Sequence, residues 1–187
     1  GQKMSKSLGN VVDPKEVQDK YNSDVFRLWV SSVNYSDDVQ FGDMVLKSCG
    51  DYYFKLRNTL RYILGNMYEY KGYSGDFRDK DLVAMKRCDS MYKNVLNGYA
   101  SMEFKKSFQE LMNWVNDFSS QYLDLETKSH LYEYDTYSEE RQRCQYVLKY
   151  SLERFMKALA PMCSFLAEDA YQNYPFKKNK SVFFELY

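Results

Sequence analysis

The chain has 187 residues, 44% of them hydrophobic and 18% aromatic, which is enough to bury the core of one domain with an appendage. Its 26 Lys and Arg residues balance its 26 Asp and Glu residues. This balance excludes a global positive field, so any nucleic-acid binding must come from local patches. No apolar run approaches the ~20 residues of a membrane span, and we find no signal-peptide pattern. We therefore expect no membrane partner.

Cysteine and histidine usage argues against a metal site. The four cysteines are too far apart in the sequence for a CxxC pair or a zinc ribbon; they are Cys49, Cys88, Cys144 and Cys163. The single histidine, His130, is too little for a histidine-based metal site or a histidine triad. We predict reduced cysteines in the core of an intracellular protein, no metal site, and a His130 on the surface of a connector.

The stretch Lys3-Met4-Ser5-Lys6-Ser7, followed by Leu8-Gly9-Asn10, is the most informative part of the chain. Its lysines and serines make a flexible loop that is rich in donors for phosphate oxygens. A loop of this kind can close over a polyphosphate and stabilise the charge that develops as pyrophosphate leaves. For a generic Lys and Ser pair, a solvated basic turn would be the preferred interpretation.

Two short helices are predicted after this loop. Asp13 is placed to cap the first, Pro14 to occupy its first position, and Glu16 to complete a capping box, with the end near Lys20. Ser23 is predicted to cap the second. Within it, Asp24 and Arg27 stand three residues apart and are placed to pair.

Four long helices follow in the predicted order. Asp43 is expected to cap the first, which ends before the glycines at 72 and 75. The others are expected at about 79–102, at 103–122 and after the N-cap Ser138, with apolar residues at helical spacing. A polar connector is predicted at 126–137, a loose basic tail at 176–180 and an extended segment at 181–186. Because the connections are short, we predict an all-α, up-down helical bundle.

With the loop and the bundle placed, the chain resembles bacterial-type isoleucyl-tRNA synthetases over essentially its whole length. The pentapeptide KMSKS marks the class I synthetases in general. The further stretches that carry the resemblance are KMSKSLGN (3–10), DVFRLWVSS (24–32), NYSDD (34–38), RNTLRYIL (57–64), VNDFSSQYLD (115–124), LAP (159–161) and SFLAE (164–168).

The resemblance implies a domain order and an activity. It implies a KMSKS loop and stem-contact region at 1–42, an anticodon-binding helical bundle at 43–175 and a C-terminal tail at 176–187. It implies that a longer parent protein attaches isoleucine to tRNA-Ile with ATP and Mg²⁺. Because the HIGH motif, the Rossmann fold and the editing insertion of the family are not present in this sequence, we expect this piece alone to be inactive and to hold no cofactor.

The resemblance also assigns residues to the ATP site. Lys6 is expected to contact ATP with Lys3 beside it as the second catalytic lysine, and Ser5 and Ser7 are expected to supply hydroxyl donors. Gly9 is expected to let the backbone bend. Without the rest of the active site, we expect this loop to be mobile.

For tRNA, a face that combines hydrogen-bond donors with stacking groups is expected. Arg57, Asn58 and Arg61 lie on one side of the first long helix, where they can hold RNA or tie the helix to its neighbours. Trp114 is a candidate stacking platform for a base. The alternative is packing in the core, which is the more common role of an aromatic residue at helical spacing. We expect a monomer that binds tRNA-Ile, in the cytoplasm or, for a eukaryotic source, in an organelle.

Two alternatives remain open at this point. The first is that the chain is a segment of the valine or leucine enzyme. The RLWV and RNTLR stretches favour the isoleucine enzyme over both. The second is a freestanding helical RNA-binding module with synthetase-derived sequence. The sequence upstream of Gly1 separates the second alternative from a ligase, because only a ligase requires a HIGH motif and a Rossmann half there.

Overall fold

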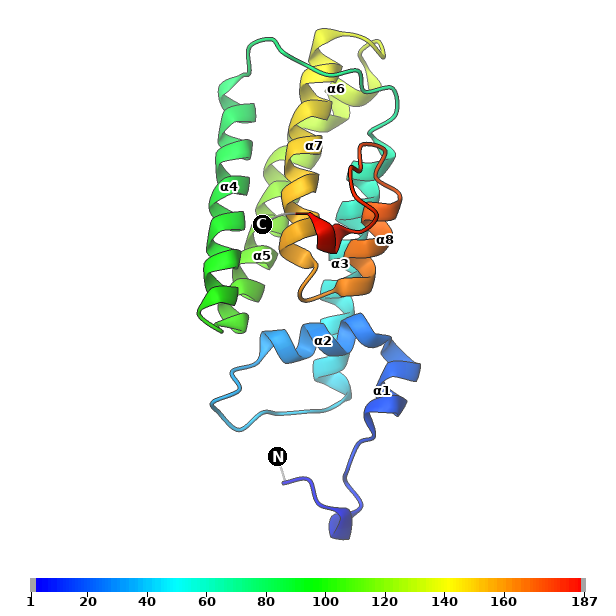
Figure 1. The fold of residues 1–187 in the computed structure, drawn as a ribbon, viewed down its shortest axis with the longest axis vertical. Coiled ribbons are helices and arrows are strands. Elements are labelled where there is room, and N and C mark those ends of the chain that lie inside the picture. Colours follow the sequence, from blue (N-terminus) through cyan, green and yellow to red (C-terminus); the bar gives the residue numbers. More distant parts are fainter. Residues whose placement is uncertain (1–2, 186–187) are drawn as a thin grey trace.

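The computed structural model describes residues 3–185, and all the regular secondary structure in that range is helical (Figure 1). This confirms the predicted all-α class. The helices are α1 (Pro14–Tyr21), α2 (Ser23–Ser32), α3 (Asp43–Gly65), α4 (Asp79–Ala100), α5 (Phe104–Phe118), α6 (Lys128–Tyr132), α7 (Glu139–Leu159) and α8 (Ser164–Gln172).

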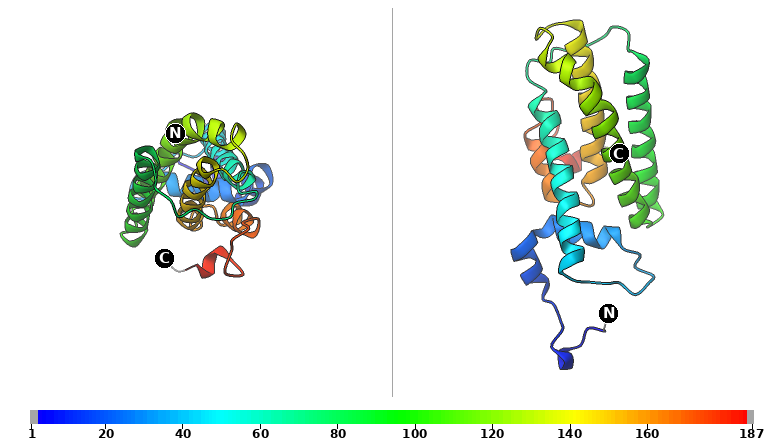
Figure 2. Two further views of the ribbon diagram at one scale, coloured as in Figure 1. Left: turned by 90° about the horizontal axis from the view of Figure 1, so that it is seen from above. Right: turned by 180° about the vertical axis from the view of Figure 1, so that it is seen from behind.

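The long helices α3, α4, α5 and α7 run along the long axis of the molecule, and α1 and α2 form a foot at one end (Figures 1 and 2). Helix α4 packs against α5 and α7, whereas α3 packs against α2 and α7. The residues that α3, α5 and α7 turn inward include Leu56, Leu111 and Phe155, each with no exposed surface. The N-terminal loop lies beyond the foot, and α6 lies at the opposite end of the molecule.

Two of the predicted caps are confirmed. The Asp13 carboxylate accepts a hydrogen bond from the Lys15 N–H at 2.8 Å, with Pro14 at the first helical position. The Ser138 hydroxyl accepts one from the Arg141 N–H at 3.3 Å. In both cases the partner lies two or three residues away, which is why the sequence alone indicates the contact.

Two other caps were predicted one residue too late. Asn22, at φ 76°, caps α2 by accepting from the Val25 N–H at 3.0 Å, so Ser23 is already helical. Asparagine is one of the few residues that tolerate a positive φ. Gly42 precedes α3, and Asp43 stands in the first turn with its carboxylate 2.9 Å from the Lys20 ammonium.

The predicted pairing of Asp24 with Arg27 is wrong, because both side chains bind the turn between α7 and α8. The Asp24 carboxylate accepts from the backbone N–H groups of Phe165 at 3.3 Å and Leu166 at 2.7 Å. Arg27 donates to the carbonyl oxygens of Met162 at 3.1 Å and Pro161 at 2.5 Å. An acid at the start of α8 and a base at the carbonyls after α7 both match the helix dipole. These contacts attach the foot to the bundle.

The C-terminal part differs from the prediction in three places. Residues 119–127 form a π-helical segment that continues α5, and α6 follows inside the predicted connector. The residues 182–184 form a 3₁₀ turn, so the predicted extended segment is wrong within the described residues; its last member, Leu186, lies outside them. The basic tail packs on the bundle: the Phe176 ring lies 5.6 Å from the Tyr174 ring, and Lys177 donates to the Gln172 carbonyl at 2.8 Å.

All four cysteines are free and buried, as predicted. Burial raises the pKa of the Cys88 and Cys144 thiols to about 12, so both stay protonated at neutral pH. Within residues 3–185, no group of three or more His, Cys, Asp or Glu side chains is placed to hold a metal ion.

Candidate nucleic-acid interface

The loop Lys3–Asn10 is held in shape by its own hydrogen bonds. The Asn10 side chain accepts from the Ser5 N–H at 2.8 Å and donates to the Lys3 carbonyl at 3.3 Å. The Ser5 hydroxyl accepts from the Leu8 N–H at 3.2 Å and so caps the 3₁₀ turn Lys6–Leu8. Gly9 follows at φ 63°, where a side chain would be strained. Asn10 is therefore a positioning residue that sequence reasoning did not single out.

This bracing presents polar groups to solvent at the tip of the molecule. Lys3, Lys6 and Ser7 are exposed, and Ser5 is half-buried with its hydroxyl 3.0 Å from the Ser7 hydroxyl. Figure 1 shows the loop beyond the foot, away from the bundle. Two exposed ammonium groups beside two hydroxyls can bind phosphate oxygens without first breaking an ion pair.

The outer face of α3 carries the three polar residues expected to bind RNA. Asn58 and Arg61 are exposed and Arg57 is half-buried. Within residues 3–185 their side chains enter none of the hydrogen bonds or ion pairs, so the alternative role of tying α3 to its neighbours has no contact to support it. Phe54, one turn before Asn58, is 58% exposed. It adds a stacking surface that was not predicted. The signal in the sequence was an aromatic residue four positions before Asn58, on the same side of the helix.

Trp114, the predicted stacking platform, is only 5% exposed. Its ring stacks on Phe118, with centroids 4.9 Å apart, and meets Phe155 edge-on at 5.3 Å. This is the arrangement that the packing alternative predicts. Its indole N–H is buried and has no hydrogen-bond partner among the described residues.

A buried charged network joins α4 to the π-helical segment at the far end of the bundle from the loop. The fully buried Asp81 carboxylate is bound by the Arg78 guanidinium at 2.9 Å and by the Tyr122 hydroxyl at 2.7 Å. Burial opposes ionisation of Asp81, but these donors outweigh it and lower its pKa. Arg78 also lies 2.9 Å from His130, which is half-buried, so the predicted surface position of His130 is wrong. Because its charges are paired and hydrogen-bonded, this network stabilises the bundle end.

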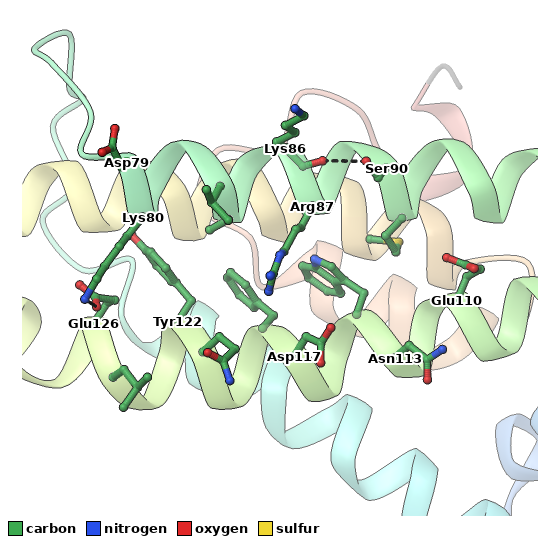
Figure 3. Close-up of a pocket in the computed structure, with 17 residues that line it drawn as sticks. Asp79, Lys80, Lys86, Arg87, Ser90, Glu110, Asn113, Asp117, Tyr122 and Glu126 are labelled. Atoms are coloured by element: carbon green, nitrogen blue, oxygen red, sulfur yellow. Dashed lines mark hydrogen bonds and ion pairs between the residues drawn. The ribbon is translucent and has the colours of Figure 1, made fainter.

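A groove of about 770 Å³ lies between α4 and the combined α5 and π-helical segment (Figure 3). Trp114, Phe118 and Tyr122 lie at its base, and each is only 3–5% exposed. Its walls carry charged and amide side chains, among them Arg87 from α4 and Asp117 from α5. The Asp117 side chain is exposed at this groove.

Two family models match this chain, one at each end of the sequence, and neither covers residues 43–80. Residues 81–187 match the family described as "Anticodon-binding domain of tRNA ligase". The chain belongs to this anticodon-binding family. Residues 1–42, which include the exposed loop, match a second family, "tRNA synthetases class I (I, L, M and V)". The resemblance inferred from the sequence is thereby confirmed at the level of the family.

Curated relatives of this anticodon-binding domain carry the name isoleucine–tRNA ligase. One from Prochlorococcus marinus is 39% identical over 202 residues, covering 100% of this chain and 21% of the relative. One from Fervidobacterium nodosum is 39% identical over 197 residues, covering 99% of this chain and 21% of the relative. The chain thus spans about a fifth of the length of the relatives it matches.

A solved structure confirms the fold of the domain. The ternary complex of the Agrobacterium radiobacter K84 agnB2 LeuRS with tRNA and LeuAMS superposes with a TM-score of 0.74. It covers 95% of this chain and 21% of that chain at 15% identity, so the likeness shows the fold alone. Within residues 3–185, no helix has the length and apolarity needed to cross a lipid bilayer.

Proposed function

We propose that this chain is the tRNA-binding segment of an isoleucine–tRNA ligase, in which the bundle contacts the anticodon and the Lys3–Asn10 loop serves the ATP site of the longer protein. The observation that carries the proposal is the combination of an exposed, self-braced KMSKS loop with a bundle of the anticodon-binding family. The relatives that match over the whole chain are named isoleucine–tRNA ligases, which favours isoleucine over valine or leucine.

The proposed division into loop and stem-contact region (1–42), bundle (43–175) and tail (176–187) has physical support at its first boundary. The first of these regions ends at Gly42, directly before α3. Asp24 and Arg27 then attach the foot to the α7–α8 turn by hydrogen bonds. A rigid foot would keep the ATP-site loop at a constant distance from the anticodon-binding face, which a tRNA bound at both places requires.

In the proposed reaction, the carboxylate of isoleucine attacks the α-phosphorus of ATP and pyrophosphate leaves. Lys6, with Lys3 beside it, would stabilise the negative charge on the departing phosphates, and Ser5 and Ser7 would donate hydrogen bonds to their oxygens. Mg²⁺ would be held mainly by the phosphates of ATP. This loop contributes positioning and charge, and the amino-acid pocket would belong to the rest of the longer protein.

The α3 face is the proposed contact for unpaired anticodon bases. Arg61 and Asn58 supply donors that have no partner within residues 3–185, and Phe54 supplies an exposed ring on which a base can stack. The molecule as a whole is neutral, so we expect few phosphate contacts and an affinity that falls moderately with salt. We propose that the protein acts as a monomer in the cytoplasm, or in an organelle if the source is a eukaryote.

Binding to tRNA tests the bundle. The chain should bind tRNA-Ile more tightly than the same tRNA with an exchanged anticodon, and Arg61→Gln should weaken both complexes, whereas Asp51→Asn on the same helix should not. Equal affinity for the two tRNAs would contradict base reading by this bundle.

Amino-acid activation by the full-length protein tests the loop. Lys6→Ala should slow ATP–pyrophosphate exchange and leave the affinity for tRNA unchanged, with Lys15→Ala in α1 as the control. Unchanged exchange would refute the role of Lys6. Charging assays with isoleucine, valine and leucine separate the three enzymes, and a gene without a HIGH motif upstream of Gly1 would favour the freestanding RNA-binding module.

A further inference from the structure

The shape of the Lys3–Asn10 loop does not come from packing against the rest of the molecule. Figure 1 shows the loop beyond the foot, and no residue of its 3₁₀ turn is buried. Ser5 and Asn10 are half-buried, and the other residues of the loop are exposed. Since a segment with so few buried contacts is not held by the core, hydrogen bonds within the loop must set its shape.

The Asn10 carboxamide joins the end of the loop to its beginning. Its oxygen accepts from the Ser5 N–H at 2.8 Å, and its amide N–H donates to the Lys3 carbonyl at 3.3 Å. The two partners fix the orientation of the carboxamide, because an N–H requires the oxygen and a carbonyl requires the nitrogen. One planar side chain thus holds two backbone groups, five and seven residues earlier in the chain.

Each lysine of the loop is anchored through its own carbonyl group. The Lys3 carbonyl is bound by Asn10, and the Lys6 carbonyl accepts from the Gly9 N–H at 3.2 Å. Within residues 3–185 the two ammonium groups take part in no ion pair. The backbone beneath both cations is therefore held, while their charged ends stay available to an anion.

Holding the backbone in advance matters for charge stabilisation. Cations that are already in place stabilise a developing negative charge without paying an ordering cost at that moment. If only a fraction of the loops had the required shape, the rate and the apparent affinity would fall by that fraction. Loss of the two Asn10 hydrogen bonds should lower this fraction about tenfold, which their net contribution accounts for.

We propose that Asn10 is the positioning residue of the phosphate-binding loop, and that it sets the spacing of Lys3 and Lys6 before ATP arrives. Asn10 acts through the two lysines rather than on the phosphates. The inference rests on the proposed function, because ATP is the polyphosphate that the loop is proposed to serve. It adds a side chain whose loss should impair the chemistry while both lysines are still present.

Limited digestion with trypsin, which cleaves after lysine and arginine, measures how often the loop opens. Asn10→Ala should speed cleavage after Lys6 about tenfold, because cleavage follows the population of the open loop. Cleavage elsewhere in the chain should keep its wild-type rate. Asn94→Ala is the control: it removes an exposed α4 asparagine whose side chain donates to Glu110 at 3.2 Å, and it should not change cleavage after Lys6. This assay needs neither ATP nor tRNA.

ATP–pyrophosphate exchange by the full-length protein tests the link to the lysines. Asn10→Ala should lower kcat about tenfold and leave KM for isoleucine unchanged, and Asn94→Ala should change neither. In the Lys6→Ala background, Asn10→Ala should lower kcat by only about threefold or less, because the main group that it positions is gone. A residue that merely stabilises the fold would lower kcat by the same factor in both backgrounds.

The outcomes separate this inference from the proposed function. If Lys6→Ala slows exchange but Asn10→Ala does not, the ATP role of the loop stands and the positioning role of Asn10 is overturned. An unchanged rate of cleavage after Lys6 in Asn10→Ala, or equal effects of Asn10→Ala in the two backgrounds, would also overturn it. If Lys6→Ala leaves exchange unchanged, the ATP role falls and the inference falls with it, whatever the cleavage rate.

Discussion

Replacing Asp24 by alanine should destabilise the protein, because its carboxylate caps a helix that lies far away in the sequence. The carboxylate, 2% exposed, accepts the buried Leu166 N–H at 2.7 Å and the Phe165 N–H at 3.3 Å. A buried donor without a partner costs about 1–3 kcal/mol, and the loss of an N-cap costs about 0.5–2 kcal/mol. These two estimates describe overlapping effects and are not summed.

Part of this cost is offset because the substitution also removes a buried charge that is less favourable in the folded protein than in water. Burial raises the pKa of Asp24, and the two N–H donors and Arg27 lower it only in part, so the ionised group is not ideally solvated in the folded protein. We therefore expect a net loss of about 2 kcal/mol for Asp24→Ala in the free energy of unfolding. For a chain of this length that corresponds to a fall in Tm of about 4–8 °C.

Urea unfolding followed by circular dichroism at neutral pH measures this difference, provided that the slope with urea is unchanged. Asp24→Asn keeps one acceptor oxygen and should lose less stability than Asp24→Ala. Asp51→Ala removes an exposed carboxylate from α3 and should stay within about 0.5 kcal/mol of the wild type. An Asp24→Ala variant as stable as Asp51→Ala would refute the capping role and, with it, the rigid attachment of the foot.

Three further predictions concern the bundle. Gly98→Ala would place a Cβ 2.1 Å from the Ser107 hydroxyl and should lower the free energy of unfolding by about 1–3 kcal/mol. Gly50→Ala, which has no atom within 4 Å of the new Cβ, should leave that free energy unchanged or raise it by up to about 1 kcal/mol. Urea unfolding compares the two variants, and equal effects would contradict the close contact at Gly98. The pKa of Asp81 is lowered in the folded state, so its contribution is complete above its ordinary pKa of 3.8 and is lost as the pH falls through the folded value. The stability gap between the wild type and Asp81→Asn should therefore shrink only below about pH 4, and a gap that closes at neutral pH would contradict this assignment. The four buried thiols should react slowly with a disulfide reagent in the native protein and rapidly in urea, and fast reaction of the native protein would count against their burial.

The helices and several of their ends were predictable because the signals are local. Apolar spacing of three and four residues placed α3, α4, α5 and α7, and the caps at Asp13 and Ser138 depend on partners within three residues. The errors at Ser23 and Asp43 are one residue long. They occur where Asn22 and Gly42 adopt backbone conformations that hydrophobic spacing does not encode.

The candidate site was predictable only in part. Lys3–Ser7 and the donors on α3 could be named from the sequence, since a motif and a helical face are both short-range patterns. Asn10 as the brace of the loop was a local contact that the sequence reading overlooked. The groove depends on how α4 lies against α5, which no local pattern in the sequence encodes.

The sequence by itself determined the all-α class, the helical order, the exposed KMSKS loop and the family. Each of these depends on residue type and on neighbours within about one helical turn. The tertiary structure alone decided what Asp24 and Arg27 bind. Asp24 reaches N–H groups more than 140 residues away, where the i,i+3 rule pointed to Arg27. The physical reason is that a buried charge takes the strongest partner that packing brings to it, and that partner is set by the whole fold.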